Sequence, residues 1–227
     1  FGLRRSGLGI LRVLIEGKVD LDLTRLLRHA VSLQPVTPEG GVDTLVRELE
    51  DFLFERLRGL YATDVQAQGE GGQDLVAPSI FEAVLAVRPS SPLDFDRRMS
   101  AIKEFAALEA SSALAAANKR ISNILRQAGA SAMDTTVDPT LLQEGAEKAL
   151  YAALESKRSG VEADLDAGHY AQAMATLAEL REDVDQFFDD VMVMADDEAV
   201  RSNRLALLAQ LRGLFTRTAD ISLLQTS

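Results

Sequence analysis

The chain has 227 residues, a formal net charge of −11 and no cysteine, and 47% of its residues are hydrophobic. This length and composition are typical of one large or two small globular domains, and they exclude a disordered chain or a fibrous repeat. The lack of cysteine excludes disulfides, a thiol nucleophile and thiolate metal sites. No window holds the roughly 18 apolar residues of a membrane span. We therefore expect a soluble, cytoplasmic protein.

The first third of the sequence predicts a helical hairpin followed by a longer helix. Apolar residues recur at helical spacing in residues 8–15 and 23–30, before Pro35 and Pro38 end the pattern. Residues 42–64 carry a longer stripe of the same period. The chain starts with phenylalanine, and arginines interrupt the first stripe, so we predict no signal peptide and interpret the sequence as part of a longer polypeptide.

A glycine-rich stretch then separates two predicted subdomains. Residues 66–73 contain Gly69, Gly71 and Gly72 and have no apolar period, which indicates an exposed boundary. Short helices are predicted over residues 80–87 and from residue 93 toward residue 109. The fold class we expect is all-α.

The next predicted helix, residues 112–128, has one apolar and one cationic side. Lys119, Asn123 and Arg126 lie opposite the apolar stripe. Residues 97–126 hold six basic and two acidic side chains. A local cationic surface therefore survives in an acidic chain, and local fields decide where a polyanion docks.

The last part of the chain predicts acidic helices and a final basic helix. The acidic helices are expected over residues 141–166 and 170–193, and the final helix is expected to begin near Asp196 or Asp197. Residues 138–198 hold four basic and sixteen acidic side chains, whereas residues 199–217 hold four arginines and no acid.

Arg204 lies within the apolar stripe of the final helix, so it is expected to be partly buried. A buried guanidinium needs a carboxylate, which leads us to predict a structural ion pair. The candidate partners are Asp189, Asp190 and Asp196. Arg201 and Arg212 lie at the edge of the stripe, where we expect them to reach solvent or phosphate.

The sequence offers no convergent catalytic site. His29 and His169 lack a histidine or cysteine at metal-ligand spacing, so no metal site is predicted. The glycine-rich stretch lacks the Lys-Ser/Thr of a phosphate-binding loop. The aspartates of residues 183–197 are spread around their helices and form no acid–base pair.

Several runs of residues resemble the β-subunit family of bacterial glycyl-tRNA synthetases. They begin at Phe1-Gly2-Leu3-Arg4-Arg5 and at Ala117-Asn118-Lys119-Arg120-Ile121, and the longest covers residues 187–205, with a further match at residues 219–225. Together they span the chain in order. The Asp-Ala-Leu-Arg signature of one anticodon-binding domain type reads Asp197-Glu198-Ala199-Val200-Arg201, with an extra glutamate and a valine for leucine.

The resemblance implies how the chain divides into domains and which subunit of the enzyme performs each function. Residues 1–64 would be the tail of a helical HD-like region without its His-Asp dyad, residues 65–76 a loop, and residues 77–227 a DALR-type anticodon-binding domain. The parent enzyme would be a glycine-tRNA ligase with α2β2 subunits. Its α subunit would use ATP to activate glycine, and this part of β would bind tRNA(Gly) with no cofactor and no catalytic residue of its own.

Single-stranded bases are recognised by stacking and hydrogen bonding while basic side chains hold the phosphates. Lys119, Arg120 and Arg126 are the predicted phosphate contacts, Asn123 is the predicted base contact, and arginine planes can replace aromatic rings in stacking. A second group of candidates comprises Arg201, Asn203 and Arg212. The alternative is a helical interaction scaffold that docks the α subunit or another protein partner through the acidic block.

Overall fold

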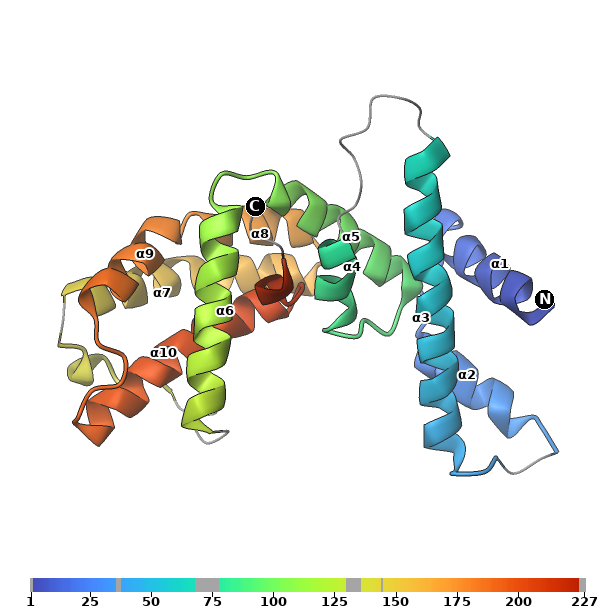
Figure 1. Ribbon diagram of the computed structural model, residues 1–227, viewed down its shortest axis with the longest axis horizontal. Helices are drawn as coiled ribbons and strands as arrows, with labels where there is room; N and C mark the ends of the chain where they lie inside the picture. Colours follow the sequence, from blue (N-terminus) through green and yellow to red (C-terminus); the bar gives the residue numbers. More distant parts are fainter. Residues whose placement is uncertain (1, 36–37, 68–77, 130–135, 144, 225–227) are drawn as a thin grey trace.

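The computed structural model describes residues 2–35, 38–67, 78–129, 136–143 and 145–224, with side chains described throughout except in residues 62–67. Within these ranges the chain forms ten α-helices and two short 3-10 helices, and no strand (Figure 1). The prediction of an all-α protein is confirmed.

The first three helices are α1 (Gly2–Glu16), α2 (Leu23–Ser32) and α3 (Val42–Ala67). They lie where the sequence predicts helices, but α1 and α2 each pack against α3 and do not form the predicted two-helix hairpin. The Asp22 carboxylate caps α2 by accepting a hydrogen bond from the Arg25 backbone N–H. Gly7 lets α1 lie close to α3, because a Cβ at this position would come within 3.0 Å of the Leu53 side chain.

Helix α3 joins α1 and α2 to the rest of the molecule. Figure 1 shows α1 and α2 on one side of α3, with α4 (Pro78–Leu85) and α5 (Pro92–Ala106) on the other. The Phe95 ring centroid lies 5.4 Å from that of Phe54 and 5.1 Å from that of Phe81. One continuous core therefore crosses the predicted boundary. The glycine-rich stretch itself, residues 68–77, lies outside the described residues.

The remaining elements form the second part of the fold. They are α6 (Ser111–Ala128), η2 (Pro139–Leu141), α7 (Gly145–Asp166), α8 (Tyr170–Ala178), α9 (Arg181–Asp190), α10 (Glu198–Thr216) and η3 (Ile221–Leu223). In Figure 1, α6 crosses α10, and η3 lies against α6. Most of α10 is buried, and Asp197 caps its start by accepting hydrogen bonds from the Ala199 and Val200 backbone N–H groups.

The predicted single helix over residues 170–193 is wrong, because the structure divides it into α8 and α9. The Leu180 N–H bonds to the Leu177 carbonyl oxygen, three residues back, and the Leu180 side chain is fully buried. The break lets α8 pack against α5 while α9 packs against α6. Neither proline nor glycine marks it, so only tertiary packing explains it.

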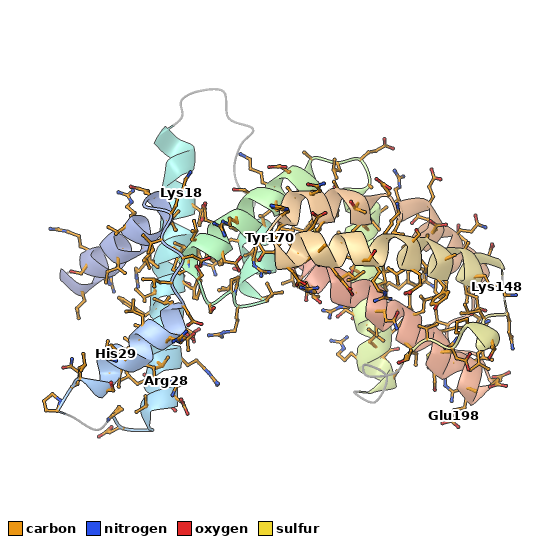
Figure 2. All side chains as sticks on the ribbon, turned by 180° about the vertical axis from the view of Figure 1, so that it is seen from behind. Lys18, Arg28, His29, Lys148, Tyr170 and Glu198 are labelled. Atoms are coloured by element: carbon orange, nitrogen blue, oxygen red, sulfur yellow. The ribbon has the colours of Figure 1, made fainter. Side chains whose placement is uncertain are left out.

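A polar network joins α5, α8 and the end of α10. Arg98 donates to the Asp94 carboxylate (2.7 Å), the Tyr170 hydroxyl (2.9 Å) and the Thr218 carbonyl oxygen (3.0 Å). The Tyr170 hydroxyl donates to Asp94 Oδ1 at 2.6 Å. Figure 2 places Tyr170 at the start of α8, in the middle of the molecule. The network therefore ties the last helix to the interior.

This network predicts an alkaline stability change. Burial, and next the hydrogen bond to Asp94, raise the pKa of Tyr170 from 10.0 to about 12. The folded state thus holds this proton more tightly than the unfolded chain, so the stabilisation is complete below pH 10 and is lost as the pH rises through about 12. In thermal melts, the Tm should decline less between pH 10 and about 12 for Tyr170→Phe than for the unchanged protein.

The tyrosinate absorbance checks the same prediction directly. The difference between the titration curves of the unchanged chain and Tyr170→Phe should have its midpoint near pH 12. A midpoint at the ordinary value of 10.0 would contradict the proposed role of burial and of Asp94.

Candidate nucleic-acid interface

The exposed side of α6 carries three cations and an amide. Lys119, Arg120, Asn123 and Arg126 are all exposed, and the opposite side of the helix is buried by Leu114, Ile121, Leu125 and three smaller residues. The helix contains no acidic residue. Among the described residues, no carboxylate forms an ion pair with any of these three cations. We call these four residues the α6 cationic face.

Asn123 and Arg126 form a defined pair on this face. One Arg126 guanidinium nitrogen donates to Asn123 Oδ1 at 2.9 Å. This bond occupies the amide oxygen of the exposed Asn123, and the NH2 group, a double donor, has no partner among the described residues. Arg126 also lies in the last turn of α6, where the helix dipole favours a positive charge.

Arg120 contacts an aromatic ring of another helix. Its guanidinium carbon lies 4.3 Å from the ring centroid of Phe188, which is half-buried near the end of α9. Phe188 in turn meets the buried Phe187 ring edge-on, with 5.6 Å between the centroids. The contact fixes the Arg120 side chain by a cation–π interaction.

The second group of predicted contacts has hydrogen-bond or ion-pair partners within the chain. Asn203 is buried, accepts a hydrogen bond from the Asp138 N–H (2.7 Å) and donates to the Asp138 carbonyl oxygen (3.0 Å). Arg201 donates to the Ala195 carbonyl oxygen at 2.8 Å. Arg212 pairs with Asp220 at 2.9 Å. Arg201 and Arg212 therefore have partners within the chain, and their contact with RNA stays a prediction.

Arg204 is buried and has a carboxylate partner, but the expected partners are wrong. Glu147 on α7 receives two hydrogen bonds from Arg204, at 2.6 and 3.3 Å, and the two side chains are 0% and 5% exposed. The predicted Asp189, Asp190 and Asp196 are exposed instead. Arg204 also donates to the Met192 carbonyl oxygen at 2.8 Å, so the pair holds the connection between α9 and α10.

Two participants were missed from the sequence. Glu147 lies in the apolar stripe of α7, three and seven residues before the buried Leu150 and Leu154, which is the same signal that singled out Arg204. Phe188 gave no such signal. Its contact with Arg120 joins residues 68 positions apart, and nothing local indicates it.

Both histidines are exposed. His29 is exposed on α2, and His169 lies before α8 with its Nδ1 3.6 Å from Asp164. In the parts of the chain that the structure describes, no three His, Asp or Glu side chains are grouped so as to hold a metal ion. Within the same parts, no helix has both the length and the apolar character needed to cross a bilayer.

Comparison with known families places this interface in a class. The family described as DALR anticodon binding domain matches residues 114–222, from within α6 to η3, and thus includes the entire α6 cationic face. By this match, residues 114–222 form a helical domain of the DALR anticodon-binding class. The family described as glycyl-tRNA synthetase beta subunit matches residues 1–70. The domain boundary expected at residue 77 stays a prediction.

Individual relatives extend these matches over the whole chain. Glycine--tRNA ligase beta subunits from Marinobacter nauticus and Hahella chejuensis are 46% and 44% identical to it, over 100% and 99% of the chain. That of Aeromonas salmonicida is 47% identical over 99%. The chain belongs to the glycyl-tRNA synthetase β-subunit family. It spans 31% of the length of each of these three relatives.

Proposed function

We propose that this chain binds the anticodon stem-loop of a glycine tRNA through the α6 cationic face. The observation that carries the proposal is an acid-free helix whose three exposed cations and exposed amide all lie inside a matched anticodon-binding domain. Lys119 and Arg126 bind loop phosphates, and Asn123 donates to a base edge. In this proposal the chain binds the RNA and catalyses no reaction itself.

The proposed parent enzyme is an α2β2 glycine-tRNA ligase of the cytoplasm. In it, the α subunit binds ATP and glycine and forms the aminoacyl-adenylate, while the β subunit holds the tRNA. The relatives named glycine--tRNA ligase beta subunit support this assignment.

Binding of a glycine tRNA anticodon stem-loop, measured at several salt concentrations, tests the proposal. The affinity should fall with salt, because each phosphate contact releases counterions, and a loop of altered anticodon should bind more weakly. Lys119→Ala should make the slope of log affinity against log salt concentration less steep by about 0.7 to 0.9, which is the contribution of one phosphate contact. Asn123→Ala should reduce the preference for the cognate loop.

A matched variant on the other part of the molecule controls for net charge. Lys18 is exposed on the turn between α1 and α2, away from α6 (Figure 2). Lys18→Ala should leave the salt slope unchanged. Equal effects of Lys18→Ala and Lys119→Ala would contradict a local site, and no binding of any loop would contradict the proposal itself.

Docking of a protein partner is a second candidate function, favoured by exposed apolar residues on α1. Leu3 and Val13 are 84% and 66% exposed. Such residues suit a protein surface better than RNA. Co-purification with the α subunit that is lost in Leu3→Ser/Val13→Ser, with stem-loop affinity unchanged, would support this second role, and unchanged co-purification would contradict it.

A further inference from the structure

Arg120 is held differently from the other cations of the α6 cationic face. Lys119 has no partner among the described residues, and Arg126 bonds to Asn123 on its own helix. Arg120 instead lies over the Phe188 ring of α9. Its guanidinium is therefore fixed from beneath by a neighbouring helix, while the side chain stays exposed to solvent.

The support under Arg120 is anchored in the core. Phe187 is fully buried, and its ring meets the Phe188 ring at an interplanar angle of 82°. Helices α6 and α9 also pack directly against each other. The three side chains form a stack that rises from the interior to the surface, with Arg120 outermost. We call Phe187, Phe188 and Arg120 the surface stack.

An outer guanidinium face that is fixed in this way suits a planar ligand. No hydrogen bond or ion pair restrains Arg120 within the described residues, and its side chain is exposed. A flexible lysine or arginine serves a phosphate as a point charge, whereas a held guanidinium plane offers a surface on which an unpaired base stacks. Because only 5% of the residues are aromatic, an arginine plane takes the place of an aromatic ring in base stacking.

The neighbouring amide supplies the second half of a base site. Asn123 lies one helical turn after Arg120, and Arg126 accounts for its amide oxygen. Its NH2 group is left to donate to a carbonyl or ring-nitrogen acceptor on a base edge. A stacking plane and a double donor without a partner among the described residues thus lie one helical turn apart on α6.

We propose that one unpaired base of the bound RNA loop stacks on Arg120 of the surface stack and accepts a hydrogen bond from Asn123. This inference rests on the proposed anticodon binding and deepens it. It assigns Arg120 to base recognition, in place of the phosphate contact expected from the sequence. The role depends on the plane of the side chain as well as on its charge.

Arg120→Lys separates the two roles, because lysine keeps the charge and removes the plane. Stem-loop affinity of the 227-residue chain should fall about 5- to 100-fold, the range found for loss of one stacked base. The salt slope should change little, since the charge stays. Arg47→Lys, at an exposed arginine of α3, is the matched control and should leave the affinity unchanged.

Abasic nucleotides placed in turn at each loop position identify the stacked base. At one position the abasic loop should bind the unchanged protein more weakly by the same factor, and Arg120→Lys should add no further loss there, as expected of two partners in one contact. Phe188→Leu should reproduce the loss, whereas Phe188→Tyr, which keeps the ring, should retain binding. Thermal melting identifies any variant that fails to fold.

The possible results are distinct. If the unchanged chain binds the loop but Arg120→Lys binds equally well, Arg120 is a phosphate contact or a bystander, and this inference is overturned while the proposed function stands. Additive losses at every abasic position overturn it too. If the unchanged chain binds no loop at all, both the proposed function and this inference fail.

Discussion

Glu147→Ala is expected to lower the free energy of unfolding by about 3 to 5 kcal/mol, because it leaves the Arg204 guanidinium buried without its counter-charge. Arg204 would keep only its bond to the Met192 carbonyl oxygen. The Gln143 N–H, which now donates to Glu147 at 3.1 Å, would lose its partner as well. Urea unfolding followed by circular dichroism measures the change.

A double replacement shows whether the loss of stability comes from the unpaired charge or from lost packing. Glu147→Leu with Arg204→Met removes both charges and keeps apolar volume, so its stability should lie much closer to that of the unchanged protein. Arg181→Ala removes one partner of an ion pair whose Glu109 is exposed, and should cost about 0 to 1 kcal/mol. A Glu147→Ala loss as small as that of Arg181→Ala would contradict the importance of the buried pair.

Phe95→Ala is expected to cost about 3 to 5 kcal/mol, the range for deleting a large ring from a packed core. Phe95 is fully buried, and its ring meets those of Phe54, Tyr61 and Phe81. Because these contacts join α3 to α4 and α5, the loss should also loosen the first three helices from the rest. Calorimetry would show a lower Tm, and hydrogen exchange would show faster exchange in α3.

Tyr61→Phe is the matched control within the same cluster. It keeps the ring but loses the hydrogen bond from the Tyr61 hydroxyl to Asp96 (2.7 Å), so it should cost only about 0.5 to 1.5 kcal/mol. The loss of stability in Phe95→Leu should lie between those of Phe95→Ala and Tyr61→Phe. If Phe95→Ala unfolded with an unchanged midpoint and α3 exchanged as slowly as before, the two parts of the chain would not share a core.

The helices themselves could be predicted from local patterns. The apolar periods of residues 8–15, 42–64 and 112–128 each correspond to a helix in the structure, and the predicted start of α10 near Asp197 agrees with its cap. Periodicity works for these three stripes because α1, α3 and α6 each bury one side. It failed at Leu180, where the division between α8 and α9 follows from what each half packs against.

The candidate site was predictable in part. The α6 cationic face follows from the spacing of Lys119, Asn123 and Arg126, and the structure does expose these residues. The positions of Arg201, Asn203 and Arg212 did not follow, because their partners Ala195, Asp138 and Asp220 lie in connections whose course the sequence pattern does not define.

The sequence by itself determined the all-helical class, the order of the helices, the cationic side of α6 and the buried position of Arg204. All of these depend on which side of one helix a residue occupies, and this is a local property of a 3.6-residue period. Tertiary structure alone decided that Arg204 pairs with Glu147, that Phe95 of α5 packs against Phe54 of α3, and that Arg120 lies on Phe188. Each of these contacts joins two elements, and their meeting depends on how the whole set of helices packs around a shared core.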